Sequence, residues 1–299
     1  MDVFVSLNGM YSRGETLIQA TRDFDRNRIS LEALEAAYEA DYAALRELQG
    51  DVPLVSDGLL NWQDLVRPFA HLTGADPGPL TRYFETNTFY RVLHFPKAVT
   101  WGRLDEWAAR YFRFGTMAFL PSPYTFTRMA TGLSLEDATA LLRDVVAHLV
   151  PRGFHTFSFQ EPFAVYEGNA QALAALKPAL ETLREVAPDA RFVLTFYFGD
   201  AAPLLSVAWD LPVDAVGVDL THTDVAALDV PQGRGLMLGI VDTTNSLLET
   251  PEVVQEALNL ARSKRPQFLI LSGSADFFFL PRDVADAKYR FLKQIANSG

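Results

Sequence analysis

The sequence predicts a single (β/α)8 barrel that spans residues 1–299. Eight short apolar runs alternate with longer stretches of helical periodicity along most of the chain. These runs do not alternate between polar and apolar residues, which is typical of parallel strands covered on both faces. No linker, repeat or low-complexity stretch divides the chain. A doubly wound open sheet is the alternative, because periodicity does not report closure, although no Gly-x-Gly-x-x-Gly motif follows the first run.

The predicted strands, in chain order, are Val3–Leu7, Val52–Val55, Thr116–Leu120, His155–Phe159, Phe192–Tyr197, Ala215–Asp219, Leu236–Val241 and Phe268–Leu271. Helices are expected between them, and three of these have clear start signals. Ser30 and Ser134 are N-cap residues before amphipathic stretches, and Pro251 occupies a first helical position. The chain between the second and third strands is longer than one crossover needs. We therefore expect an added extended segment at Asn87–Phe95 and a short helix at Gly102–Phe112.

The composition excludes several kinds of site. The chain has no Cys, which removes disulfides, zinc–thiolate sites, iron–sulfur clusters and cysteine nucleophiles. Its 26 basic and 37 acidic residues give a net charge of -11 without a local basic patch, so nucleic acid is not an expected partner. The N-terminus lacks the basic segment of a signal peptide, and no apolar run approaches the roughly 20 residues of a membrane span. We expect a cytoplasmic protein with no membrane partner.

Polar residues follow most of the predicted strands. In a barrel, chemistry lies on the loops after the strands, so these residues are the first candidates for a site. They are Asn8, Gly9, Asp57, Ser122, Tyr124, Gln160, Glu161, Tyr197, Asp200, Asp219, His222, Asp242, Asn245, Ser274 and Asp276. The acidic members could hold an amine, a divalent metal or a proton in transfer. Each could instead cap the next helix or stabilise a turn.

Glu161, Asp219 and His222 are the candidate catalytic residues. Pro162 fixes the turn after Glu161 and either aims this carboxylate inward or only shapes the turn. Asp219 and His222 stand three residues apart after a strand, and their side chains are of the types that bind zinc when Cys is absent. We expect no metal site; if the chain holds a metal, these three residues are its ligands.

Two other segments are notable at this end of the predicted barrel. Asp242–Ser246 is rich in small hydrogen-bonding groups, which suit either a ligand carboxylate or a helix cap. The aromatic triplet Phe277–Phe279 indicates core or the wall of a hydrophobic pocket, with an interface as the alternative.

Seven motifs resemble those of the cobalamin-independent methionine synthase family, in the same order. They are Gly9–Arg13, Asp23–Ser30, Ser56–Trp62, Phe84–Arg91, Leu120–Phe126, Gln160–Pro162 and Gly239–Ser246. The first is similar to the family's Gly-Ser-Tyr-Pro-Arg element, and Gln160-Glu161-Pro162 is similar to its Asp-Glu-Pro element. The resemblance covers nearly the whole chain and implies a barrel fold and methyl transfer to homocysteine.

The zinc-binding positions of the family's catalytic barrel are altered here. That barrel holds zinc through a His-x-Cys pair, a Glu and a second Cys. Tyr197-Phe198-Gly199 stands at the His-x-Cys pair, Asp219 lies near the Glu, and Ala275 replaces the last Cys. Met10 and Gln160 replace two residues that hold the amino acid substrate. The resemblance therefore implies that this chain lacks the zinc–thiolate mechanism.

The chain is more similar to the family's N-terminal barrel, which has no zinc and helps to form the folate cleft. Thr195–Asp200 and Leu211–Asp214 resemble elements of that half. The resemblance makes methylfolate a possible ligand, because pterin rings stack on aromatic faces and need few polar contacts. The candidate ligand-binding residues are Asn8, Asp57, Trp62, Asn87, Tyr90, Tyr124, Gln160, Tyr197, Asp242 and Asn245.

The function that we expect from this resemblance is that of a companion barrel. Such a barrel would act with a separate zinc-bearing catalytic barrel in methyl transfer to homocysteine, that is, in methionine biosynthesis. A self-sufficient methyltransferase or metal-assisted enzyme with another acceptor is one alternative. A barrel that binds a small molecule without chemistry is the other, since one barrel fold hosts many functions.

Overall fold

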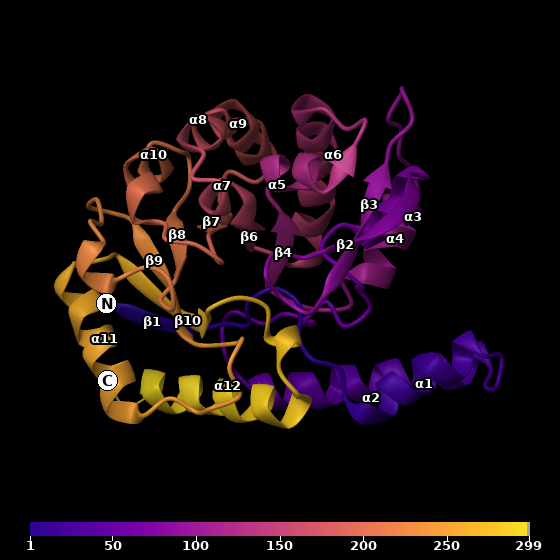
Figure 1. Ribbon diagram of the computed structural model, residues 1–299, viewed down its shortest axis with the longest axis horizontal. Helices are drawn as coiled ribbons and strands as arrows, with labels where there is room; N and C mark the ends of the chain where they lie inside the picture. Colours follow the sequence, from indigo (N-terminus) through magenta and orange to yellow (C-terminus); the bar gives the residue numbers. More distant parts are fainter. Residues whose placement is uncertain (298–299) are drawn as a thin grey trace.

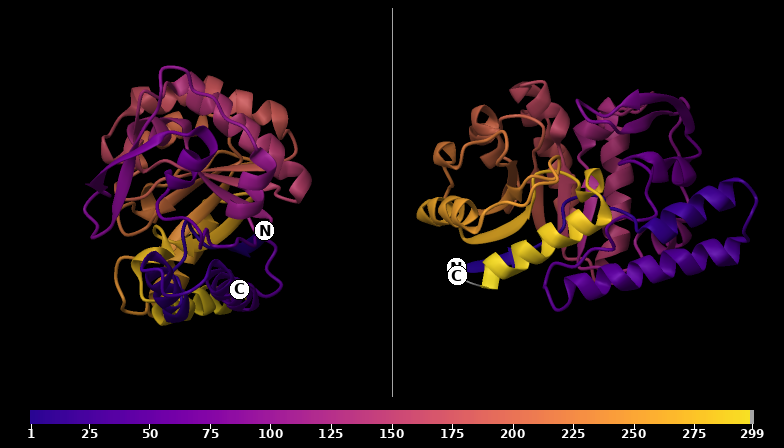
Figure 2. Two further views of the ribbon diagram at one scale, coloured as in Figure 1. Left: turned by 90° about the vertical axis from the view of Figure 1, so that its right-hand side faces the viewer. Right: turned by 60° about the horizontal axis from the view of Figure 1, so that its bottom comes forward.

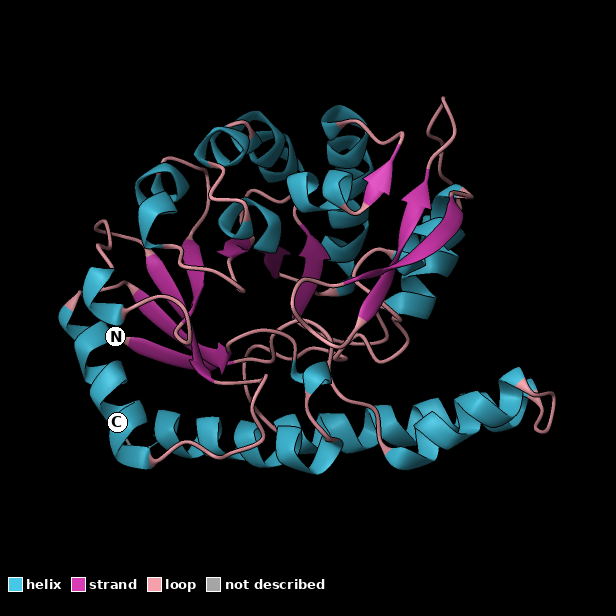
Figure 3. Ribbon diagram, in the orientation of Figure 1, coloured by secondary structure: helices cyan, strands magenta, loops and turns pink. Residues whose placement is uncertain are grey.

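The computed structural model describes residues 1–297 and is built around a curled parallel sheet of seven strands (Figures 1 and 3). The strand order is β1, β10, β9, β8, β7, β6, β4. The strands are β1 Asp2–Val5, β4 Met117–Pro121, β6 Thr156–Gln160, β7 Arg191–Thr195, β8 Ala215–Asp219, β9 Gly235–Val241 and β10 Phe268–Gly273. Every pairing is parallel, so the carboxyl ends of the strands meet at one mouth. The α/β class and seven of the predicted strands are confirmed.

The predicted strand at Val52–Val55 is not formed, so the described residues do not reach the eight strands that were expected. Pro53 has no backbone N–H to give to a neighbouring strand. The segment instead meets the start of β4, where the Val55 carbonyl accepts hydrogen bonds from the N–H groups of Thr116 (2.8 Å) and Met117 (3.0 Å). It therefore lies beside β4, where the second strand was expected, without extending the sheet.

Helices lie along the outside of the curled sheet, with α6, α9 and α10 above it and α12 below it in Figure 1. The helices are α1 Glu15–Asp25, α2 Leu31–Gln49, α3 Arg67–Thr73, α4 Leu104–Tyr111, α5 Pro123–Arg128, α6 Leu135–Leu149, α7 Pro162–Tyr166, α8 Ala170–Ala174, α9 Leu176–Val186, α10 Leu205–Trp209, α11 Pro251–Ser263 and α12 Arg282–Asn297. Helices α1 and α2 lie side by side and extend beyond the sheet as an arm (Figures 1 and 2).

The predicted helix starts are confirmed. The Ser30 hydroxyl accepts a hydrogen bond from the Ala33 N–H at the start of α2, and Ser134 does the same for Asp137 at the start of α6. Each cap satisfies one of the backbone donors that a helix leaves unpaired in its first turn. Helix α11 begins at Pro251, where the missing N–H costs nothing.

A separate small sheet takes two strands from the chain between the Val52–Val55 segment and β4 and a third from the chain after β4. It contains β2 Asp76–Arg82, β3 Phe89–His94 and β5 Ala130–Thr131, with β2 and β3 antiparallel. Strand β3 and helix α4 confirm the extended segment and the short helix that the sequence predicts there. Strand β2 was not predicted, because its sequence Asp-Pro-Gly-Pro-Leu-Thr-Arg is poor in strand-forming residues. The turn between β2 and β3 reaches the mouth of the main sheet.

Burial explains why the main strands could be recognised. All residues of β4, β6, β8, β9 and β10 are buried. Most of these strands carry apolar side chains on both faces, which gives the continuous runs seen in the sequence. Strand β6, with the sequence Thr-Phe-Ser-Phe-Gln, instead alternates polar and aromatic side chains. Within residues 1–297, no helix combines the length and the apolar character that crossing a membrane would require.

Candidate ligand-binding site

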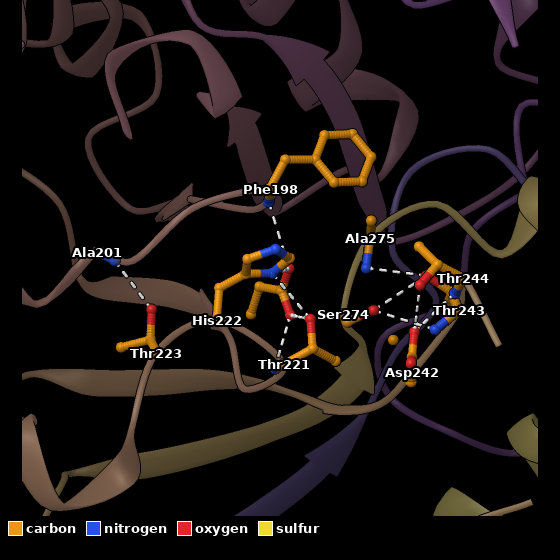
Figure 4. Close-up of polar contacts among 12 residues, drawn as sticks. Phe198, Ala201, Thr221, His222, Thr223, Asp242, Thr243, Thr244, Ser274 and Ala275 are labelled. Atoms are coloured by element: carbon orange, nitrogen blue, oxygen red, sulfur yellow. Dashed lines mark hydrogen bonds and ion pairs between the residues drawn. The ribbon is translucent and has the colours of Figure 1, made fainter. Parts of the chain in front are cut away.

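A pocket of about 420 Å³ lies at the mouth formed by the carboxyl ends of the strands. The turn between β2 and β3, helix α7 and the loops after β7, β8, β9 and β10 all contribute to it. The lining residues are Phe84, Glu85, Thr86, Asn87, Thr88, Tyr166, Phe198, His222, Thr244, Phe278 and Phe279. Figure 4 shows Phe198, His222 and Thr244 on three of these loops. A second hollow of about 550 Å³ lies at the opposite ends of the strands, where barrel residues usually serve stability.

Aromatic rings form much of the pocket wall. The ring centroid of Phe84 lies 4.9 Å from that of Tyr166 and 5.2 Å from that of Phe198. Phe198 in turn lies 5.8 Å from Phe279. Phe277 is fully buried, whereas Phe278 and Phe279 line the pocket, which confirms the core and pocket-wall interpretation of the triplet. Such a wall suits a flat ring or an organic cation.

Asp219 and His222 form a hydrogen-bonded pair at the edge of the pocket. The Nδ1 atom of His222 lies 2.8 Å from Oδ2 of Asp219, and Thr221 donates its N–H and its hydroxyl to Oδ1. The Phe198 N–H also donates to Oδ2, at 3.3 Å. Because a carboxylate only accepts, the Nδ1–H is the donor in this contact, and Nε2 is the ring nitrogen left to face a ligand. The Asp219 side chain is 2% exposed and that of His222 46%, so the imidazole is the member available to a ligand.

Glu161 is buried and caps helix α7. Its carboxylate accepts hydrogen bonds from the hydroxyl groups of Ser122 and Thr125 and from the N–H groups of Thr125 and Ala164. Burial raises the pKa of Glu161, and these hydrogen bonds act against that rise. The four donors occupy the carboxylate, so Glu161 joins the loops after β4 and β6 rather than facing the pocket.

A layer of polar groups lies beneath the aromatic wall. The hydroxyl groups of Tyr83 and Tyr197 are 2.7 Å apart, and Phe198 packs against both rings. Asn8 is also buried and donates from Nδ2 to the Gly273 carbonyl, at 3.1 Å. Its Oδ1 atom is buried without a donor within residues 1–297.

The remaining predicted residues are held by contacts within the chain. Asp57 is buried, which raises its pKa to about 7, and its carboxylate accepts hydrogen bonds from the Leu59 and Arg113 N–H groups.

The other predicted ligand-binding residues are also engaged within the chain. Trp62 and Tyr90 are buried. The Gln160 amide donates a hydrogen bond to the Ser158 hydroxyl, and the Tyr124 hydroxyl donates one to Glu167. The side chains of Asp242 and Asn245 each accept a hydrogen bond from the backbone N–H of the residue two positions later in the chain. Of the predicted ligand-binding and catalytic residues, the structure brings Asn87 and His222 together in the pocket lining.

Sequence reasoning did not single out Tyr83, Phe84 and Phe198 as one cluster. Phe84 opens the motif Phe84–Arg91 and Phe198 lies in Thr195–Asp200, so both were visible within the resemblance. Their contact depends on the turn between β2 and β3 reaching the end of β7. The spacing of residues along the chain does not encode that approach.

Comparison with known protein families decides how this site is interpreted. Residues 73–264 match the model of the cobalamin-independent synthase, N-terminal domain. The match covers more than half of the chain. The chain belongs to this family. The match confirms the resemblance seen in the motifs, and it falls on the family's N-terminal barrel rather than on its catalytic barrel.

Curated relatives carry the name 5-methyltetrahydropteroyltriglutamate–homocysteine methyltransferase. The protein of Nitrobacter winogradskyi is 26% identical over 72% of this chain and 30% of its own length. The protein of Herpetosiphon aurantiacus is 27% identical over 76% of this chain and 33% of its own length. The chain thus spans about a third of the length of these family members.

Solved structures of the same fold include proteins of similar size. A B12-independent methionine synthase from Shewanella sp. W3-18-1, in complex with selenomethionine, has a TM-score of 0.77 at 17% identity, over 98% of this chain and 96% of that one. A putative vitamin-B12-independent methionine synthase from Listeria monocytogenes has a TM-score of 0.75 at 13% identity, over 99% and 98%. At these identities the likeness shows the fold alone.

The zinc site of the family's catalytic barrel does not fit the residues of this chain. The sequence has no Cys to supply thiolate ligands. Tyr197 is hydrogen-bonded to Tyr83. Oδ1 of Asp219 accepts from Thr221, and its Oδ2 is occupied by His222 and the Phe198 N–H. Across residues 1–297, no three His, Asp or Glu side chains are grouped so that they could hold a metal ion. Glu161 is not joined to the Asp219–His222 pair, and we derive no step through zinc.

Proposed function

We propose that this chain is a methionine-synthase-like barrel of the N-terminal type, which acts in methyl transfer to homocysteine together with a separate zinc-bearing barrel. Membership of the N-terminal domain family supports the methionine-synthase-like role. The altered strand ends support the need for a partner, because Tyr197, Asp219 and Ala275 stand at the expected zinc positions. The partner would supply the zinc and the bound homocysteine thiolate.

The aromatic pocket is the observation that carries this proposal. Its volume of about 420 Å³ lies in the range of roughly 300–1,000 Å³ typical of small-molecule sites. Phe84, Phe198 and Phe279 offer ring faces to a pterin, while Glu85 and His222 offer polar groups at the rim. In this role the chain's residues hold methylfolate and exclude water, and the methyl group leaves toward the partner.

Calorimetric titration with 5-methyltetrahydropteroyltriglutamate tests the ligand. We expect the wild-type chain to bind it and Phe198→Ala to weaken binding about tenfold, because a stacking face is lost (about 1.4 kcal/mol). Val150→Ala is the matched control, since Val150 is 37% exposed and does not line the pocket. Absence of binding, or equal loss in both variants, would contradict the proposal.

The Asp219–His222 pair favours a second candidate, an enzyme that works alone with altered chemistry. An imidazole that is oriented by a buried carboxylate and keeps a free Nε2 is the usual arrangement of a general base. Any turnover by the isolated chain should then disappear in His222→Gln. It should persist in His94→Gln, because His94 pairs with a neutral hydroxyl at an exposed position. Equal turnover in both variants would exclude this role for His222.

A further inference from the structure

The hollow at the amino ends of the strands is separate from the pocket at the mouth. Its volume of about 550 Å³ also lies in the range of roughly 300–1,000 Å³ typical of small-molecule sites. The two share no lining residue, and the function proposed above makes no use of this second space. We call it the lower hollow. Residues near the starts of four strands line it, namely Asp2, Phe4, Thr156, Arg191 and Phe268.

The Arg191 side chain crosses the amino end of the curled sheet. Arg191 is the first residue of β7. Its Cζ atom lies 4.1 Å from the ring centroid of Phe268 on β10 and 5.0 Å from that of Phe4 on β1. Strands β8 and β9 separate β7 from β10 in the sheet, so these contacts depend on its curl. Attraction to the two ring faces holds the guanidinium in this place.

Small residues at the starts of the two intervening strands leave room for these contacts. Strand β8 begins with Ala215 and β9 with Gly235, and the two are register partners. A Cβ atom built on Gly235 would lie 2.4 Å from Cζ of the Phe268 ring. A larger residue at this position would therefore displace Phe268, and with it one of the two rings that hold Arg191.

The guanidinium of Arg191 has no acceptor of its own. It offers five N–H donors, yet it makes no hydrogen bond or ion pair with any group in residues 1–297. Burial lowers the pKa of Arg191, because the charged form loses contact with water. Arg128 and Arg282 differ from it, since both pair with carboxylates and the pKa of each is raised. A ligand that supplies an acceptor would stabilise the Arg191 charge.

Arg184 lines the same hollow, but its acceptors lie within the chain. Its guanidinium donates to the Asp214 carboxylate, at 2.7 Å, and to two backbone carbonyl groups. Its Cζ atom also lies over an aromatic ring, 3.9 Å from the centroid of Phe192. The two arginines therefore share a ring contact and differ in their acceptors. Arg191 is the one that an incoming oxyanion would meet.

Two free carboxylates decide which oxyanion suits the lower hollow. Asp2 and Asp189 line it and are exposed, and within the described part of the chain neither side chain has a hydrogen-bond or ion-pair partner. Asp2 is the register partner of Phe268, so its side chain lies on the same face of the sheet as that ring. These carboxylates would repel a phosphate dianion and attract an ammonium group. The mixture of charges therefore suits a ligand that carries both a carboxylate and an ammonium group.

We propose that the lower hollow binds a small zwitterion, such as an amino acid, with its carboxylate on Arg191 and its ammonium group toward Asp2 and Asp189. A planar guanidinium gives two parallel N–H donors to one carboxylate, which makes it the side chain best suited to this contact. The site is independent of the proposed function, since it uses neither the pocket at the mouth nor a partner barrel.

NMR titration of the full chain with L-alanine tests this site, with propionate and ethylammonium as matched probes that each carry one charge. We expect alanine to shift the amide resonances of Arg191 and Phe268 and to bind about tenfold more tightly than either probe. Arg191→Gln should weaken alanine binding about tenfold or more. Arg152→Gln is the control, because Arg152 is exposed and does not line the hollow. Absence of alanine binding, equal affinity for alanine and propionate, or equal loss in both variants would overturn the proposal.

A second variant keeps the test decisive if loss of the ring contacts in Arg191→Gln disturbs folding. The double variant Asp2→Asn, Asp189→Asn changes two exposed groups and leaves Arg191 and its rings in place. It should weaken alanine binding about tenfold without weakening propionate binding. Unchanged alanine binding would contradict the proposal. So would loss of alanine binding in Phe198→Ala, which would place alanine at the mouth, whereas failure of methylfolate to bind would affect the proposed function alone.

Discussion

The hydroxyl groups of Tyr83 and Tyr197 lie 2.7 Å apart and join the small sheet to the main one. Tyr83 directly follows β2, and Tyr197 lies two residues beyond the end of β7. Both side chains are buried, so each hydroxyl depends on the other for its hydrogen bond. This contact holds the turn between β2 and β3 over the mouth of the sheet and thereby shapes the pocket.

Replacing Tyr83 with Phe should destabilise the protein by about 1–2 kcal/mol, because the Tyr197 hydroxyl is left buried without a partner. Urea unfolding measures this loss. Tyr166→Phe is the control, since Tyr166 is 49% exposed and its hydroxyl bonds to Glu85 in contact with water. The double variant Tyr83→Phe, Tyr197→Phe should recover part of the loss. Equal unfolding midpoints for the two single variants would contradict this role of the pair.

Glu161 should stabilise the folded protein rather than bind a ligand. Glu161→Ala leaves donors from Ser122, Thr125 and Ala164 unpaired, so we expect a loss of about 3 kcal/mol in the free energy of unfolding. Glu181→Ala, at an exposed position on α9, should change it by less than about 0.5 kcal/mol. If Glu161→Ala unfolds like the wild-type chain yet loses ligand binding, Glu161 belongs to the site instead.

The pH dependence of the free energy of unfolding should reflect the ionisation of the buried Asp276 carboxyl group. Its pKa is near 3.9 in an unfolded chain and about 7 in the folded one, so the folded state holds the proton more strongly. The contribution of Asp276 to stability is therefore most favourable below pH 4 and falls as the pH rises to about 7. Asp276→Asn should remove this fall and be more stable than the wild-type chain by about 1–3 kcal/mol at pH 8. Urea unfolding of both chains at pH 5 and pH 8 checks this, and a constant difference would contradict it.

Zinc should not be retained at one equivalent per chain. The expected thiolate ligands are absent, and Glu161 and Asp219 are occupied by donors from the chain. Elemental mass spectrometry after purification without chelators measures the content, and His222→Ala should leave it unchanged. A full equivalent of zinc that disappears in His222→Ala would favour the self-sufficient enzyme.

The main strands could be predicted because burial on both faces gives continuous apolar runs. Val52–Val55 is similarly apolar, but Pro53 removes a donor, and the Val55 carbonyl bonds to Thr116 and Met117 without the segment forming a strand. Strand β2 was not predicted, because its Pro and Gly residues argue against a strand. It forms nevertheless, because it pairs with β3.

The candidate site was predictable only at the level of which loops form it. Asp219, His222 and Asp276 were recognised as strand-end residues, and all three lie at the mouth. Their partners were not predictable, because the four donors to Glu161 come from two loops that the sequence does not show to be adjacent. The positive φ of Phe198 likewise follows from packing rather than from residue type.

Formation of methionine tests the central claim most directly. Homocysteine and 5-methyltetrahydropteroyltriglutamate would be incubated with this chain, with a zinc-loaded catalytic barrel, and with both together. We predict no methionine from this chain alone and at least about tenfold more from the mixture than from the catalytic barrel alone. Methionine formed by this chain alone would contradict the companion role, as would a mixture no faster than the catalytic barrel.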